Sequence, residues 1–66
     1  MNKTIKFFED RAEEAADEAR HATLQNVRLR ALRSEAAWRV MADRAIAVEA
    51  ARTRNFEETK RSDDRD

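Results

Sequence analysis

The sequence TLQNVRLRALRSEAAWRVMADRAIA, residues 23–47, contains the only tryptophan of the chain, Trp38, near its middle. On an α-helix, Trp38 shares one face with residues that are alternately three and four positions apart: Ala31, Ser34, Met41, Ala45 and Val48. This spacing is typical of a helix face that packs against another helix. We therefore predict that residues 23–47 belong to the main helix of an all-α protein, and that the rest of the chain packs against it.

The composition favours helix almost throughout and leaves little material for a core. The 66 residues include no glycine, proline or cysteine, and 42% of them are charged. A domain of this length buries only about 60% of the surface that its unfolded chain exposes, so it needs additional stabilisation. Disulfides are excluded, and a single histidine does not make a zinc site. We expect no cofactor, and we expect the additional burial to come from self-association.

Residues 4–22 are predicted to form a first helix, with Thr4 as its N-cap. A mostly alanine face follows at alternating spacings of three and four, but this pattern does not continue beyond Ala22. From Leu24 onward a second pattern fits better, two residues out of step with the first. A single long helix with a stutter and a hairpin whose second helix is capped by Thr23 or Asn26 both explain this change.

We favour the antiparallel hairpin, because folding back near residues 23–26 places small residues opposite large ones, with Ala12 opposite Trp38. The same pairing brings the acidic residues of the first helix beside the arginines of the second. Exposed pairs of this kind contribute only about 0.2–1 kcal/mol each, so they select the pairing more than they stabilise it. The predicted hairpin core consists of Ile5, Phe8, Ala12, Ala15, Ala19, Val27, Ala31, Trp38, Met41, Ala45 and Val48.

The second helix is predicted over residues 24–56, longer than the first, so that residues 1–56 make up the hairpin. It carries another apolar stripe on roughly the opposite side, which one hairpin cannot cover. We expect a homodimer, a four-helix bundle, to form through this candidate surface: Phe7, Leu29, Ala36, Val40, Ala47 and Phe56. The alternative is that its alanines are helix formers on a solvated surface. Residues 57–66 contain no apolar side chain and are expected to be a disordered tail.

Several short motifs resemble a group of short bacterial hypothetical proteins of uncharacterised function. Their pattern is approximately R-A-E-E-C, then A-x-x-T-D-P-E-V-R, then L-x-x-A-x-x-W-x-x-L-A, and the resemblance covers residues 8–47. Here it is carried by RAEE (residues 11–14), AT (22–23), VR (27–28) and WRVMA (38–42). The chain has Leu24 and Gln25 in place of Asp and Pro, and Ala15 in place of Cys. The resemblance implies a corner at residues 23–26 and carries no activity with it.

No residue pattern indicates catalysis or a metal site. Glu18 and His21 have the Glu-x-x-His spacing of di-iron helical bundles, but a helical projection places both away from the predicted core. Ser34 lies in mid-helix, where its hydroxyl can bond a backbone carbonyl one turn earlier. We therefore expect a protein that is not an enzyme.

The function predicted from the sequence is that of a small interaction or scaffold protein that self-associates through its second helix, with a foreign protein as a further possible partner. Its 14 basic and 14 acidic residues give zero net charge, so we expect no attraction to nucleic acid or membranes. The N-terminal sequence MNKTIKFFED has no apolar run of signal-peptide or membrane-span length, which predicts a cytoplasmic protein. The alternative is a small Rop-like nucleic-acid-binding or regulatory dimer that uses Arg28, Arg30, Arg33 and Arg39.

Overall fold

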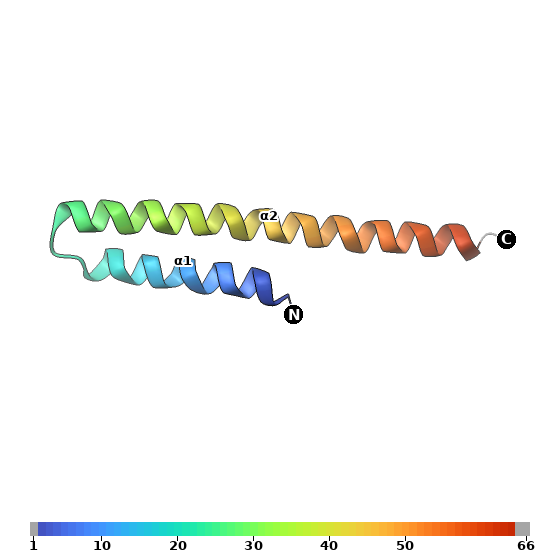
Figure 1. Cartoon of the computed structure of the whole chain (residues 1–66), viewed down its shortest axis with the longest axis horizontal. Helices are drawn as coiled ribbons and strands as arrows, with labels where there is room; N and C mark the ends of the chain where they lie inside the picture. Colours follow the sequence, from blue (N-terminus) through green and yellow to red (C-terminus); the bar gives the residue numbers. More distant parts are fainter. Residues whose placement is uncertain (1, 65–66) are drawn as a thin grey trace.

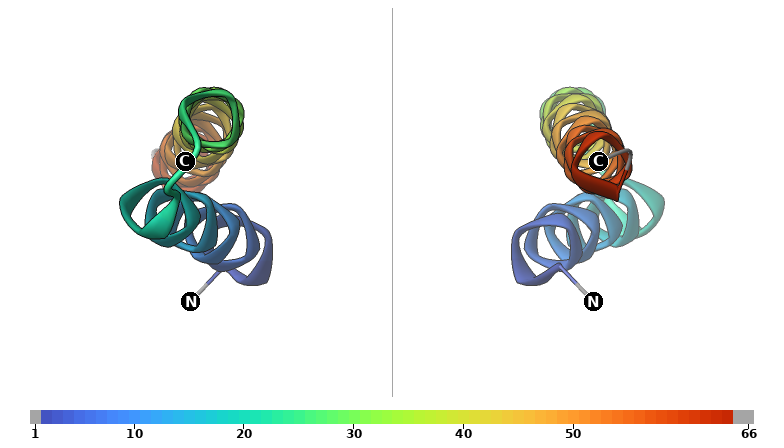
Figure 2. Two further views of the ribbon diagram at one scale, coloured as in Figure 1. Left: turned by 90° about the vertical axis from the view of Figure 1, so that its left-hand side faces the viewer. Right: turned by 90° about the vertical axis from the view of Figure 1, so that its right-hand side faces the viewer.

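Two helices of unequal length form an antiparallel hairpin in the computed structural model, which describes residues 2–64 (Figure 1). Helix α1 spans Lys3–His21 and helix α2 spans Gln25–Asp64. The hairpin is long and thin, 65 × 16 × 11 Å, and views along its length show one helix lying on the other (Figure 2). The all-α hairpin with a longer second helix is confirmed.

Asn2, and not the predicted Thr4, caps the start of α1. The backbone of Asn2 is extended, and its side-chain oxygen accepts hydrogen bonds from the backbone N–H groups of Thr4 at 2.8 Å and Ile5 at 3.2 Å. Asparagine is among the best N-cap residues because its side chain satisfies these otherwise free donors. The amide nitrogen of Asn2 also donates to Glu49 of α2 at 3.2 Å, so the cap connects the two helices.

Residues 22–24 make the corner without any residue in the left-handed region. Ala22 is extended (φ −71°, ψ 130°), and no described residue has a positive φ. The first hydrogen bond of α2 runs from the N–H of Arg28 to the carbonyl of Leu24 at 3.0 Å, which makes Leu24 the N-cap position. Neither Thr23 nor Asn26 serves as the cap, contrary to our expectation, and no side chain in the described residues caps α2.

Helix α2 continues well past its predicted end at Phe56. It remains helical through Asp64, so the structure differs from the expected disordered tail over residues 57–64, while residues 65–66 lie outside the described part. The segment contains no glycine or proline, and it is rich in Glu, Lys and Arg, which have high helix propensity. The segment therefore has no apolar side chains with which to pack, but its composition still favours helix.

The hairpin core is made chiefly of alanine. Ile5, Phe8, Val27, Trp38 and Ala45 are half-buried, whereas Met41 and Val48, both predicted core residues, are exposed. Among the residues whose burial is described, the buried ones are Ala12, Ala15, Ala16, Ala19, Ala31 and Ala42. Small side chains on both sides of this contact let the two helices approach closely.

The buried line on α2 drifts by one residue from the predicted line, because the helix keeps its own period. The drift places Glu35, Ala42 and Glu49 nearer to α1 than the predicted Ser34, Met41 and Val48. The line runs along Val27, Ala31, Glu35, Trp38, Ala42, Ala45 and Glu49. Its steps of four, four, three, four, three and four residues average about 3.7, nearer to the 3.6-residue period of a straight helix than to the 3.5-residue period of a coiled coil.

Candidate functional site

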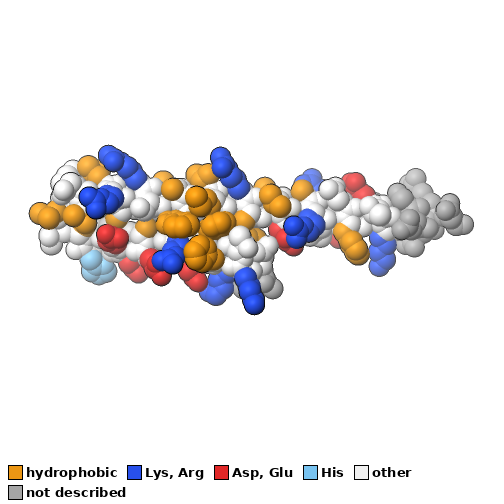
Figure 3. Space-filling model, viewed as in Figure 1, with side chains coloured by type: hydrophobic (Ala, Val, Ile, Leu, Met, Phe, Trp, Pro, Cys, Tyr) orange, Lys and Arg blue, Asp and Glu red, His pale blue; other side chains and the backbone are white. Residues whose placement is uncertain are grey.

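A cluster of three aromatic rings joins the two helices midway along the hairpin. The ring of Trp38 lies 5.9 Å from Phe7 in an edge-on arrangement and 6.0 Å from Phe8, and the two phenylalanine rings lie 5.7 Å apart. The guanidinium of Arg11 stands over the ring of Phe7 at 5.2 Å. Figure 3 shows hydrophobic side chains gathered over both helices at mid-length. The predicted pairing of Trp38 with Ala12 did not include these contacts of the Trp38 ring with Phe7 and Phe8.

A stripe of exposed apolar residues runs along the side of α2 away from α1. We call Leu29, Ala36, Val40 and Ala47 the outer stripe. Leu29 is 43% exposed and Val40 48%, and both alanines are exposed. Leu32, three residues after Leu29 and four before Ala36, is 44% exposed and extends the stripe. Leu32 was not among the residues predicted for this surface, although its spacing from Leu29 and Ala36 already indicated this face.

Phe7 and Phe56, which were grouped with this stripe, lie elsewhere. Phe7 is partly exposed and packs in the aromatic cluster between the helices. Phe56 is exposed and follows Trp38 by 18 residues, which is five full turns, so it lies on the side of α2 that faces α1 further along the hairpin. The candidate surface therefore divides into separate regions.

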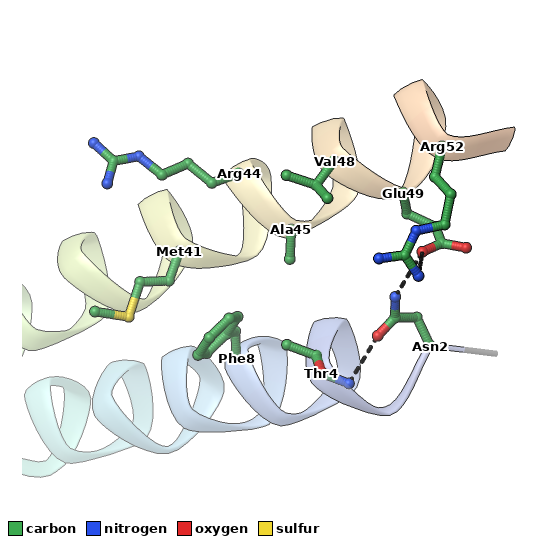
Figure 4. A pocket seen from close by; sticks show the side chains of 9 residues that line it. All are labelled: Asn2, Thr4, Phe8, Met41, Arg44, Ala45, Val48, Glu49 and Arg52. Carbon is green, nitrogen blue, oxygen red and sulfur yellow. Dashed lines mark hydrogen bonds and ion pairs between the residues drawn. The ribbon is translucent and has the colours of Figure 1, made fainter. Parts of the chain in front are cut away.

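A groove of about 430 Å³ lies where α1 begins and α2 continues past it (Figure 4). Its apolar walls come from Phe8 of α1 and from Met41, Ala45 and Val48 of α2. Polar side chains form its margin: Asn2, Thr4, Arg44, Glu49 and Arg52. Asn2, Glu49 and Arg52 are connected at one end of the groove by the Asn2–Glu49 hydrogen bond and by an Arg52–Glu49 ion pair of 3.9 Å.

Six of the seven ion pairs among the described side chains join residues of the same helix. Lys6 pairs with Asp10 at 3.3 Å, and Arg20 pairs with Asp17. Among the described side chains, the Arg39–Glu13 contact of 3.9 Å is the one ion pair that joins the two helices. These pairs are exposed, so each contributes little to stability.

The four arginines of the nucleic-acid alternative are all exposed, but they do not form one patch. Arg39 pairs with Glu35 at 2.7 Å as well as with Glu13. Arg28, Arg30 and Arg33 make no ion pair with another described side chain, and the helical period points them in different directions around α2. Their charge is spread around the helix rather than along one groove.

The described residues hold no group of three or more His, Cys, Asp or Glu side chains that could bind a metal ion. His21 is exposed, and its Nδ1 lies 2.8 Å from the backbone carbonyl of Asp17. Ser34 is exposed on α2. Within residues 2–64, neither helix has an apolar stretch long enough to cross a membrane.

Comparison of the chain with protein-family models, with curated proteins and with solved structures gives no match. The resemblance to short bacterial proteins therefore stays a prediction.

Proposed function

We propose that this protein is a non-catalytic helical interaction or scaffold protein that self-associates through the outer stripe of α2. Two hairpins joined back to back would form a four-helix bundle. The observation that carries the proposal is the exposed apolar line of the outer stripe, opposite the side that α1 covers. Its spacing of three and four residues is that of a helix-packing face.

The stripe is self-complementary when two copies run antiparallel. A two-fold axis level with Trp38 places Leu29 of one copy opposite Ala47 of the other, and Val40 opposite Ala36. Each large side chain then meets a small one, which supports close packing of the two helices. This complementarity favours a second copy over a foreign protein as the occupant.

The energetic need for such a contact follows from the alanine core. Burial of apolar surface stabilises a protein by about 25 cal/mol per Å², and an alanine offers little surface to bury. The larger apolar side chains of the chain remain partly exposed: Leu29, Leu32, Val40, Met41 and Ile46 are each more than two-fifths accessible. Covering the outer stripe would therefore add a substantial share of the total buried apolar area.

A double charge substitution tests this proposal. Leu29→Glu with Val40→Glu places four carboxylates in the dimer contact, and we expect a monomer of unchanged helix content at micromolar concentration by sedimentation velocity and circular dichroism. Ile46→Glu is the matched control, because Ile46 is 44% exposed on the same helix but off the stripe, and it should remain dimeric. A double variant that sediments like the parent would refute the outer stripe as the interface.

The alternative function, binding of nucleic acid, has one supporting observation. Arg28, Arg30 and Arg33 are exposed and make no ion pair within the described residues. A shift assay with mixed RNA and DNA at low salt separates the two functions. Binding that weakens steeply as salt rises, and that is lost in Arg28→Gln/Arg30→Gln/Arg33→Gln, would favour the alternative.

A further inference from the structure

We infer that the groove at the open end of the hairpin receives Phe56 from a second copy of this chain. This contact goes beyond the back-to-back pairing through the outer stripe, because it uses a different side of α2 and also the first turns of α1. The inference rests on the groove, on the position of Phe56 and on the charges beside each.

The groove offers an aromatic side chain an apolar floor and polar margins. Phe8, Met41, Ala45 and Val48 supply the floor (Figure 4). Its volume of about 430 Å³ falls within the range of about 300–1,000 Å³ typical of sites that enclose small ligands, so a single phenyl ring fits. Asn2 and Glu49 close one end through their hydrogen bond.

Phe56 is the most exposed of the large apolar residues described, at 69%. It lies on the line of Trp38, on the side of α2 that α1 covers nearer the corner. It cannot enter the groove of its own chain, because α2 continues without a break from Val48 to Phe56 and a straight helix holds the two about 12 Å apart. The ring therefore needs a second copy to be covered in this way.

In an antiparallel arrangement, each copy can place its Phe56 in the groove of the other. The same arrangement brings residues of opposite charge together. A two-fold axis level with Ala51 places Phe56 of the second copy beside the turn from Ala45 to Glu49. The same axis places Glu58 of the second copy level with Arg44, which makes no ion pair with any other described side chain. Two symmetric Arg44–Glu58 pairs would then flank two buried rings, which fixes the pairing of the contact.

This contact has a consequence for assembly. A chain that self-associates through the outer stripe on one side and through the groove on another has two independent two-fold interfaces. Two such interfaces join hairpins into a row instead of stopping at a dimer. A linear array of hairpins is the form of scaffold that the two surfaces together support.

Exchanging the charges of Arg44 and Glu58 tests the groove contact. Sedimentation velocity over a range of concentrations measures the association. We expect Phe56→Ala, Arg44→Glu and Glu58→Arg each to weaken association beyond the dimer by about tenfold. The double variant Arg44→Glu/Glu58→Arg should restore it, because both pairs re-form with the signs reversed. Arg30→Glu is the matched control, since Arg30 is exposed on α2 and distant from the groove.

The same variants in the Leu29→Glu/Val40→Glu background separate the two interfaces. In that background a dimer should form only well above micromolar concentration, through the groove contact, and it should be lost on Phe56→Ala. If Phe56→Ala and both charge reversals associate like the parent, or if the double reversal fails to restore association, the groove contact is refuted while the outer stripe is unaffected. If the outer stripe variants associate like the parent but Phe56→Ala does not, the groove contact holds and the outer stripe is refuted.

Discussion

Trp38 joins the helices through ring contacts with Phe7 and Phe8, while remaining only half-buried. Aromatic pairs of this geometry add about 0.5–1.5 kcal/mol each beyond area burial. We expect Trp38→Ala to lower the free energy of unfolding by about 2–3 kcal/mol in urea denaturation. Leu24→Ala, which truncates a 62% exposed apolar residue outside the cluster, is the control and should change it by less than about 0.5 kcal/mol. A Trp38→Ala variant as stable as the control would show that the cluster does not hold the hairpin.

Asn2 both caps α1 and bonds to Glu49, so one side chain links the start of the chain to the middle of α2. Asn2→Ala removes the acceptor for two backbone donors, and we expect it to cost about 1 kcal/mol. Thermal unfolding followed by circular dichroism measures this change. Asn26→Ala, an exposed asparagine without a capping bond in the structure, should unfold at nearly the parent temperature, and equal losses in both variants would contradict the role of Asn2.

At the scale of the elements, the corner between α1 and α2 lacks the residues that usually end one helix and begin the next. Leucine at position 24 is a weak N-cap, and no glycine ends α1. Leu24→Asp should therefore stabilise the hairpin by about 1 kcal/mol by supplying an acceptor to the first turn of α2. Leu24→Asn should give a similar gain without the charge, while Leu24→Ala gives none. Urea denaturation of the three variants decides this, and an Asp variant no more stable than the Ala variant would contradict it.

The change of phase between the two apolar patterns, rather than any turn residue, specifies the hairpin. Inserting two alanines after Thr23 brings the second pattern exactly into step with the first, so we expect the lengthened chain to form one continuous helix that pairs with a second copy. Small-angle scattering would then report a particle markedly longer than the 65 Å of the hairpin. Inserting two alanines after Asn26 gives the same realignment of residues 27 onward and is a second test. A lengthened chain that keeps the parent dimensions would show that the phase does not specify the fold.

Much of this fold follows from the residue pattern, and the differences have identifiable physical causes. The two phases predict the hairpin, and the Ile5-to-Ala22 face predicts which side of α1 is covered. Asn2 and Thr4 are both acceptable caps, so composition alone does not choose between them. Ala42 was missed because a strict 3.5-residue repeat drifts away from the 3.6-residue period of α2 over several turns. Phe56 lies away from the outer stripe, because a distance of five full turns places it on the same side of α2 as Trp38.

The whole molecule is a thin rod whose core is mostly alanine, so its stability should depend on association. Anything that binds only the folded state stabilises it in proportion to the logarithm of concentration. We expect the melting temperature of the parent chain to rise with protein concentration, and that of Leu29→Glu/Val40→Glu to rise much less, because only the groove contact remains. Circular dichroism melts over a hundredfold range of concentration measure this, and a concentration-independent parent would contradict coupled folding and association.

The most direct test of self-association is the solution mass of the unmodified chain, measured by light scattering from micromolar concentration upward. We predict at least twice the chain mass of 7.7 kDa at the lowest concentration, with larger species at higher concentration as the groove contact forms. A helical species that keeps the mass of one chain throughout the range would contradict the account, because the outer stripe would then remain uncovered in solution.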